Sequence, residues 1–338
     1  MFSFIVRRLL QLPLVLFGVS ILIFTVTQFL PPQIRATAFI TSERQVRQLP
    51  SIIERYGLDK DVFTQYRIWI GSVLQGNLGY STAAKRPVLE ALTDFLPATL
   101  ELALFAIIPI VLFGIFFGVL AGINRNTWID QTIRIVSIVG YALPTFVVGI
   151  FFLAFFYGQL RLFEPGRIDT ILSLTEGLPS VNGFLIFRAI FQGRWELVAD
   201  LFRHLVLPVA TLTIVVSAGL VQVVRSSVIE QLRQDYVRTA RSKGLKNRVV
   251  TFKHALKNAL IPVITVVGSL LYGLVSGVII TETVFNYQGI GLWASQAAIL
   301  NDTSGVLGFA LFSALAVTLI NLLADILYGV VDPRVRYD

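Results

Sequence analysis

The sequence predicts an all-α protein that crosses a membrane six times, with both termini in the cytoplasm. Of its 338 residues, 55% are apolar and 14% are charged, whereas a soluble domain carries about 25% charged residues. Six apolar stretches reach the roughly 20 residues that a helix needs to cross a bilayer. Basic residues concentrate in the segments that this topology places in the cytoplasm, as expected for an inserted protein.

The six predicted spans contain several prolines, among them Pro13, Pro109 and Pro144. Neighbouring helices satisfy the backbone groups that a proline leaves free, so we expect kinked and closely packed helices. The predicted spans are Leu9–Leu30, Pro97–Ile123, Ile135–Leu160, Leu205–Val224, Ala259–Thr281 and Val306–Val331.

The segments between the spans complete the predicted organisation. Two apolar runs are too short to span, and we expect them to form helices outside the bilayer. They are Val62–Leu74, and Phe184–Phe191 with Leu197–Phe202 behind it. The predicted parts are residues 1–30 (cytoplasmic N-terminus and first span), 31–96 (extracytoplasmic loop with a surface helix), 97–331 (core of five spans) and 332–338 (cytoplasmic C-terminus). The core includes the extracytoplasmic loop 161–204 and the cytoplasmic loop 225–258.

The distribution of charge supports this orientation. The cytoplasmic segments carry fifteen Lys and Arg against five Asp and Glu, while the extracytoplasmic segments carry thirteen of each. The short extracytoplasmic loop 282–305 has no Lys or Arg at all. Since short loops obey the positive-inside rule best, the N-terminus is predicted to lie inside.

Several kinds of chemistry are excluded by composition. Without cysteine, the chain has no disulfide, thiolate zinc site or cysteine nucleophile. Its two histidines, His204 and His254, are fifty residues apart and form no ligand pair at helical spacing. A phosphate-binding loop of the form GxxxxGK followed by Ser or Thr is absent from the sequence, so any ATP would be bound by other subunits.

The cytoplasmic segment 225–257 is the most polar part of the chain and has helical periodicity. We expect two short helices that meet at Gly244 and project from the membrane. Their apolar residues need a partner surface, which favours docking to a cytosolic protein. The alternative is a solvated basic loop against lipid headgroups. Nucleic-acid binding is disfavoured because no independent domain is present for it.

Motifs along nearly the whole chain resemble those of one membrane-protein family. Within and after the cytoplasmic segment they are Tyr236-Val-Arg-Thr-Ala240, Lys243-Gly244-Leu245, His254-Ala-Leu256 and Asn258-Ala-Leu-Ile-Pro262. Elsewhere they include Arg7-Arg8-Leu9, Arg55-Tyr-Gly-Leu58, Gly76-Asn-Leu-Gly-Tyr80-Ser81, Leu96-Pro-Ala-Thr-Leu-Glu101, Glu282-Thr-Val-Phe285 and Asp332-Pro-Arg334. Together they are similar to the permease subunits of the dipeptide, oligopeptide and nickel branch of ABC importers.

This resemblance implies a type I ABC importer permease fold and a set of partners. These are a second homologous permease, two ATP-binding subunits, an extracytoplasmic solute-binding protein and membrane lipid, with no nucleic acid. The chain itself would hold no cofactor, because ATP and Mg belong to the ATP-binding subunits. The family's coupling helix, which docks on those subunits, corresponds here to Tyr236, Val237, Arg238, Thr239, Ala240, Lys243, Gly244, Leu245 and His254.

The chain departs from the family at two places. The wider motif begins Glu-Ala-Ala, whereas Arg238-Thr239-Ala240 stands at those positions. We therefore do not expect this chain to form any ion pair that the family's glutamate makes. Near the end of the first span, Pro31-Pro32-Gln33 replaces the usual Gly-Asp-Pro.

Polar residues within and beside the spans are candidates for contact with solute or binding protein. A charged residue in the bilayer has to face protein or water, which makes it a functional candidate. Helix packing and helix-end stabilisation are the alternatives for these residues. The pathway candidates are Glu101, Thr145, Ser217, Gln222, Asn321 and Asp325. In the loop after the fifth span, candidates for contact with a binding protein are Glu282, Phe285 and Tyr287, with an ordinary interfacial loop as the alternative.

The predicted function is that of a non-catalytic permease subunit in a bacterial or archaeal plasma (inner) membrane. It would form half of a pathway for di- and oligopeptides and couple that pathway to ATP hydrolysis. Nickel and oligosaccharides remain alternative solutes. An autonomous channel or secondary transporter is an alternative of another class, but it usually shows inverted repeats and intramembrane charges. An intramembrane enzyme would need a nucleophile and base, or a metal site.

Overall fold

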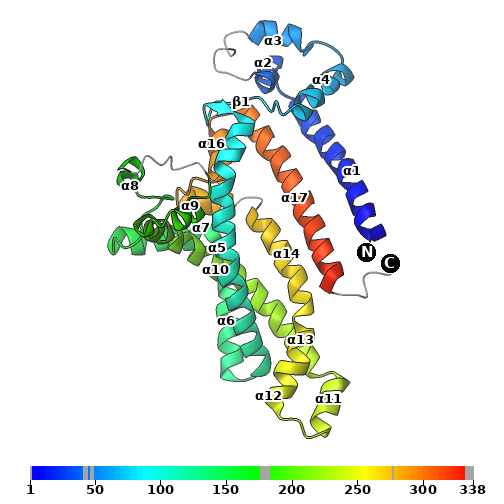
Figure 1. The fold of residues 1–338 in the computed structure, drawn as a ribbon, viewed down its shortest axis with the longest axis vertical. Helices are drawn as coiled ribbons and strands as arrows, with labels where there is room; N and C mark the ends of the chain where they lie inside the picture. Colours follow the sequence, from blue (N-terminus) through cyan, green and yellow to red (C-terminus); the bar gives the residue numbers. More distant parts are fainter. Residues whose placement is uncertain (1, 41–44, 46–48, 176–182, 276–277, 332–338) are drawn as a thin grey trace. The chain divides into compact units, whose positions relative to one another are not determined.

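The protein is built almost entirely of helices (Figure 1). Its computed structural model describes residues 2–40, 45, 49–175, 183–275 and 278–331. Within this part, β1 (Tyr80–Ser81) and β2 (Arg86–Pro87) form an antiparallel hairpin, with Tyr80 opposite Pro87. The chain divides into two compact units. The first consists of Met1–Glu101, Gly166–Leu201 and Val275–Leu322, and the second of Leu102–Pro165, Phe202–Leu274 and Leu323–Asp338.

Four helices are long and apolar enough to cross a bilayer. They are α1 (Phe2–Thr27), α5 (Val88–Ile123), α10 (Trp195–Leu232) and α17 (Thr303–Val331). Two bent pairs meet the same criterion when each is taken together: Trp128–Ala142 with Thr145–Gln159, and Asn247–Ala259 with Ile261–Val275. The described helices therefore provide four spans, or six if each bent pair is one span.

The third predicted span, Ile135–Leu160, is not one straight helix. The chain bends by 96° between α6 (Trp128–Ala142) and the pair formed by α7 (Thr145–Phe152) and the π-helical segment η3 (Leu153–Gln159). Leu143 adopts an extended conformation because the ring of Pro144 disfavours a helical residue before it. Pro144 then caps the start of α7. The proline that predicted a kink thus produces a complete break.

Two helix boundaries also differ from the sequence prediction. Leu197–Phe202, predicted as part of a separate surface helix, belongs to α10, which runs unbroken from Trp195. Likewise α5 begins at Val88, nine residues before the predicted start at Pro97. The first turns of both helices are amphipathic and precede the apolar stretch that hydropathy detects. Hydropathy alone therefore does not locate these two helix starts.

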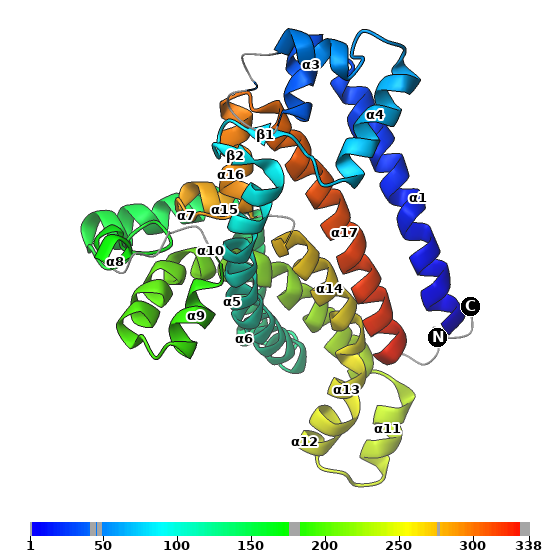
Figure 2. The same cartoon turned by 45° about the horizontal axis from the view of Figure 1, so that its top comes forward.

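In the first unit, short helices cover the end of α1 (Figure 2). They are α2 (Pro32–Ala36), the 3₁₀ turn η1 (Thr37–Phe39), α3 (Leu49–Arg55) and α4 (Val62–Leu74). The last of these coincides with the predicted surface helix. Asp61 is its N-cap residue, and the Asp61 carboxylate accepts a hydrogen bond from the Thr64 amide at 3.0 Å. The Thr64 hydroxyl also bonds this carboxylate and lowers the pKa of Asp61.

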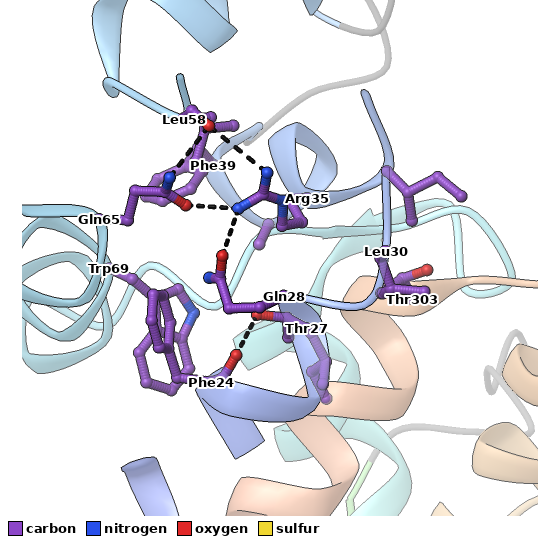
Figure 3. A pocket seen from close by; sticks show the side chains of 13 residues that line it. Phe24, Thr27, Gln28, Leu30, Arg35, Phe39, Leu58, Gln65, Trp69 and Thr303 are labelled. Carbon is purple, nitrogen blue, oxygen red and sulfur yellow. Dashed lines mark hydrogen bonds between the residues drawn. The ribbon is translucent and has the colours of Figure 1, made fainter. Parts of the chain in front are cut away.

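Arg35 joins three of these segments (Figure 3). Its guanidinium donates to the amide oxygen of Gln28, just past α1, at 2.7 Å and to that of Gln65, on α4, at 2.5 Å. It also lies 3.4 Å from the carbonyl of Leu58. A cavity of about 20 Å³ lies beside the guanidinium, next to Phe24 and Trp69. Arg35 thus fixes the extramembrane cap on α1.

Further helices belong to the first unit, and one of them, α16, packs on the start of α5. These are α8 (Thr170–Thr175), α9 (Leu185–Phe191), α15 (Ile279–Val284), α16 (Ile290–Ile299) and the N-terminal part of α17. The fully buried Trp293 of α16 packs on Val88 and Leu92 of α5. Its indole nitrogen donates to the Ser81 hydroxyl at 3.1 Å, and Ser81 in turn bonds the carboxylate of Asp302 at 2.5 Å.

In the second unit, α5 and α10 pack closely along a row of glycines. Gly114, Gly118 and Gly122 lie at intervals of four residues on one face of α5. A Cβ added to each would come within 2.8 Å of side-chain atoms of Leu220, Val224 and Val228, respectively. Small residues let helix backbones approach in this way within a membrane. The GxxxGxxxG pattern signals this contact in the sequence, whereas hydropathy carries no such signal.

Replacing Gly118 by alanine is expected to force α5 and α10 apart. The new Cβ would lie 2.5 Å from Val224 Cβ and 2.9 Å from the carbonyl oxygen of Val221. Overpacking of this kind costs about 1–3 kcal/mol. We expect a lower unfolding temperature for the purified protein in detergent.

Gly273→Ala is the matched control, because no atom lies within 4 Å of the Cβ that this substitution adds on α14 (Ile261–Val275). Both variants gain the same helix propensity. Equal unfolding temperatures for the two variants would contradict a close α5–α10 contact.

Candidate functional site

The segment after α10, which the sequence places in the cytoplasm, folds into two helical parts joined by a turn, as predicted. The first is α11 (Asp235–Ser242). The second is a continuous run of α12 (Asn247–Val249), the π-helical η4 (Val250–Ala255) and α13 (Leu256–Ala259), which leads into α14. In Figures 1 and 2, α11 and α12 lie side by side at the end of the second unit. We call residues 235–255 the α11–η4 hairpin.

Gly244 forms the turn of this hairpin. Its φ of +76° is a conformation that residues with a Cβ rarely adopt. The Gly244 amide donates to the carbonyl of Arg241 at 2.9 Å and thereby ends α11. A Cβ added at Gly244 would meet no atom within 4 Å. Glycine is therefore required here for its backbone conformation, and not for lack of space.

The inner face of the hairpin is packed on itself. Val237 and Ala240 of α11 form a buried cluster with Val250 and Ala255 of η4, and Leu232 of α10 packs against it. The expectation that the apolar residues need an external partner is therefore wrong for these four side chains. The expectation still applies to apolar side chains of the outer face. Tyr236 is 38% exposed, Leu245 is 41% exposed and Phe252 is 55% exposed.

The hairpin is anchored to two long helices. The Ser227 hydroxyl of α10 donates to the carbonyl of Ala259, at the end of α13, across 2.8 Å in a buried position. Val228 of α10 and Val263 of α14 belong to the same hydrophobic cluster as Ala259. Because packed interiors transmit displacements, a force on α11 reaches both α10 and α14.

The predicted coupling residues divide between the two faces of this hairpin. Val237 and Ala240 are buried, and His254 is half-buried on η4. The exposed members are Tyr236, Arg238, Thr239, Lys243, Gly244 and Leu245. Arg238 forms a 3.3 Å pair with Asp235 in which both side chains are exposed, so the pair adds little stability. The outer face is therefore basic with isolated apolar side chains.

Glu101 is not on an open pathway in this structure. It is fully buried and forms a 2.7 Å ion pair with Arg167, whose side chain is 1% exposed. The Ile186 amide, at the start of α9, donates to the same carboxylate at 2.9 Å, and Arg167 also donates to the carbonyl of Gly183. The pair thus joins α5 to segments far away in the sequence. Helix-end stabilisation is not its role either, since Glu101 lies more than three turns inside α5.

Arg167 is not among the residues that the sequence singles out. A carboxylate that is buried inside a predicted span needs a counter-charge. The position of Glu101 in such a span is therefore the feature of the sequence that indicates a basic partner. The sequence does not show which of the extracytoplasmic basic residues supplies that charge.

Glu282, Phe285 and Tyr287 are buried, with 0%, 1% and 1% exposure. Their side chains are thus not accessible to a docked protein, and that prediction needs correction. The Glu282 carboxylate accepts hydrogen bonds from the amides of Gly291 and Leu292, at 2.7 and 3.0 Å, and so caps the N-terminus of α16. Burial raises the pKa of Glu282 to about 7, although these bonds act against it.

The other pathway candidates lie in different surroundings. Thr145 is half-buried at the start of α7, and Asn321 is exposed on α17. Ser217 lines a groove of about 720 Å³ between α5, α6 and α10, and Gln222 lines a smaller pocket beside it. The side chain of Asp325 lies outside the described part of the structure, so its place on the pathway stays a prediction. Among the described residues, no group of three or more potential ligands is placed to hold a metal.

Removing the arginine of the buried pair is expected to destabilise the first unit strongly. Arg167→Met leaves the Glu101 carboxylate buried without its cation, a change that typically costs about 3–5 kcal/mol. The second substitution Glu101→Gln should restore part of this loss, because the carboxylate that Arg167 pairs with is then neutral. The readout is the unfolding temperature in detergent.

Arg86→Met is the control for this experiment, since it breaks the partly exposed pair of Arg86 with Asp94. Pairs of that kind contribute about 0–1 kcal/mol. Equal effects of Arg86→Met and Arg167→Met would refute a structural role for the buried pair.

The burial of Glu282 predicts a pH dependence of stability. The folded state keeps a proton up to a pKa of about 7, whereas the unfolded chain releases it near a pKa of about 4.3. The contribution of Glu282 to the free energy of unfolding is therefore fully present below the pKa of the unfolded state and is lost as the pH rises through the pKa of the folded state. Glu282→Gln, which stays neutral, should show a smaller fall in unfolding temperature between about pH 5 and pH 8. Identical pH profiles would exclude this effect.

Comparison with known proteins identifies the family. The family profile described as "Binding-protein-dependent transport system inner membrane component" matches residues 114–337, and the profile of the corresponding N-terminal region matches residues 1–103. Sequence similarity to individual family members extends over the full length of the chain.

The chain is 36% identical over 335 residues to the probable D,D-dipeptide transport system permease protein of Escherichia coli K12, covering 98% of this chain and 97% of that protein. It is 37% identical over 341 residues to the di/tripeptide transport system permease protein of Pseudomonas aeruginosa, at 100% and 99% coverage. It is 34% identical over 338 residues to the oligopeptide transport system permease protein of Bacillus subtilis, at 100% coverage of both. The family resemblance is thus confirmed, and the chain belongs to the binding-protein-dependent transport system inner membrane components, the multi-pass, non-catalytic permease subunits of the inner membrane.

Proposed function

We propose that the chain is a permease subunit of an importer for di- or oligopeptides. The full-length relatives named as di-, tri- and oligopeptide permeases support this class of solute. Nickel and oligosaccharides are the alternatives from the sequence, and no relative described above is named for either. In this proposal the chain pairs with a second permease, and the solute pathway forms between them.

The α11–η4 hairpin is the proposed docking site for an ATP-binding subunit. The observation that carries this is the combination of an exposed outer face with a buried inner face anchored to α10 and α14. A solvated loop against lipid headgroups would need neither the buried cluster nor the anchor. ATP and Mg are then bound by the docked subunits, since this chain has no phosphate-binding loop.

Solute would arrive from an extracytoplasmic binding protein. Because Glu282, Phe285 and Tyr287 are buried, other residues replace them as candidates for that contact. These are exposed residues on the same predicted side of the membrane, such as those of α4. Thr145 and Asn321 stay candidates for the pathway.

One experiment separates this proposal from an autonomous transporter. The chain is reconstituted into vesicles alone, and also together with a second permease, ATP-binding subunits and binding protein. Peptide uptake is expected only in the complete system and only with ATP. Uptake by the isolated chain under an ion gradient would overturn the importer proposal.

Replacing Gly244 by valine is expected to uncouple ATP hydrolysis from transport. Valine at a φ of +76° is strained, so the turn between α11 and η4 has to change and the outer face is displaced. Uptake should fall while ATP hydrolysis by the complex continues. The ratio of peptide transported to ATP hydrolysed measures this.

Gly193→Val is the matched control. Gly193 has a φ of +67°, and again an added Cβ would meet no atom within 4 Å. It lies between α9 and α10, away from the hairpin in sequence. The control should suffer similar backbone strain but keep the wild-type transport ratio. An equal loss of coupling in both variants would contradict the docking role.

A further inference from the structure

A basic pocket lies at the predicted cytoplasmic ends of α6 and α10, next to the start of the α11–η4 hairpin. It has a volume of about 630 Å³. Its charged lining residues are Arg125, Arg134, Arg225, Arg233 and Glu230. The role proposed above for the chain does not account for this cluster of arginines beyond their contribution to the orientation of the spans.

Only one of these arginines is neutralised by an ion pair among the described residues. Arg225 forms two bonds to the buried Asp130 carboxylate, at 2.6 and 2.8 Å, and thereby joins α10 to α6. Arg125, Arg134 and Arg233 are exposed and form no ion pair with any residue that the structure describes. The Asp130 carboxylate also attracts Arg134. Four guanidinium groups thus stand against the two acids Asp130 and Glu230, a surplus of positive charge that favours an anion.

The basic pocket continues into an apolar groove. Arg134 and Arg225 also line a pocket of about 270 Å³, which shares Ser137 and Val221 with the groove of about 720 Å³ between α5, α6 and α10. Four hydroxyl side chains, of Thr132, Ser137, Thr213 and Ser217, interrupt an otherwise apolar groove lining. Such a lining suits hydrocarbon better than a peptide, whose backbone amides would need partners.

An aromatic side chain marks the depth of the basic pocket in the membrane. Trp128, at the start of α6, is 75% exposed and follows Arg125 by three residues. Tryptophan is enriched at the level of the lipid headgroups. A basic pocket at that level, open to an apolar groove along the spans, has the polarity pattern of a phospholipid.

We propose that this site binds an anionic phospholipid, with its phosphate headgroup against Arg125, Arg134 and Arg233 and an acyl chain in the groove of α5, α6 and α10. The guanidinium groups supply charge-assisted bonds to the phosphate, and Arg225 is held by Asp130 as part of the wall. Ser217 and Gln222, which the sequence suggested for the solute pathway, then belong to the lipid site. The bound lipid would bridge α6 and α10 and stabilise their packing.

The test measures the unfolding temperature of the purified chain in a neutral detergent during titration with lipid. Dioleoyl-phosphatidylglycerol should stabilise the protein, and dioleoyl-phosphatidylcholine should have a much weaker effect. A basic residue near an anionic headgroup contributes about fivefold in affinity. The double variant Arg125→Gln/Arg134→Gln should therefore bind phosphatidylglycerol roughly 25-fold more weakly.

The control is Lys246→Gln/Arg248→Gln, which removes two exposed charges from the same predicted side of the membrane but outside the pocket. It should leave the lipid affinity unchanged. An equal loss of lipid affinity in both double variants would show that any basic surface attracts the lipid, and this would overturn the proposed site. Both pairs of residues are exposed, so loss of folding does not confuse the comparison.

Two further arms separate the possible ligands. Ala210→Phe fills the groove and should weaken binding of phosphatidylglycerol while the arginines stay intact. Inorganic phosphate should stabilise the protein far less than the lipid, and a dialanine peptide should not compete with it. Equal stabilisation by phosphate would assign the site to free anions, and competition by the peptide would assign the groove to solute. Either result would overturn the proposal.

Discussion

The contact between α5 and α10 is the constraint on which the second unit depends. Bilayer lipid is as apolar as the side chains, so helices in a membrane associate through close packing. Gly114, Gly118 and Gly122 remove the side chains that would keep the two backbones apart. The same row brings Val224 and Val228 into the cluster with Ala259 and Val263 of the α13–α14 segment. The row of glycines on α5 thus holds α10, and α10 in turn packs against the α13–α14 segment.

Mechanical coupling follows from where the cytoplasmic hairpin meets this core. Leu232 packs against the buried inner face of the α11–η4 hairpin, and the Ser227 hydroxyl is bonded to the carbonyl of Ala259. The hairpin is therefore attached at both of its ends to helices that cross the membrane. In the proposed coupling, a displacement of its outer face is transmitted to α10 and α14 together. This is the property that a permease needs if ATP hydrolysis on another subunit is to change its pathway.

The sequence predicts the helical class, the surface helix Val62–Leu74 and the helix–glycine–helix hairpin, because hydropathy, periodicity and a single glycine encode them locally. It does not predict that Glu101 pairs with Arg167, since partners 66 residues apart leave no local pattern. For the same reason Glu282, Phe285 and Tyr287 were expected on the surface. The motif around these residues can be seen in the sequence. Only the tertiary structure shows that the buried Glu282 carboxylate caps the N-terminus of α16.

The central claim is that the outer face of α11 is the contact with an ATP-binding subunit, and cross-linking tests it most directly. The chain has no cysteine, so one introduced thiol reports one position. Ser242→Cys is exposed on α11, and Phe63→Cys is exposed on α4, on the opposite predicted side. In the assembled complex, a short thiol–amine cross-linker should join Ser242→Cys, but not Phe63→Cys, to the ATP-binding subunit. No product from Ser242→Cys, or equal products from both positions, would contradict the account.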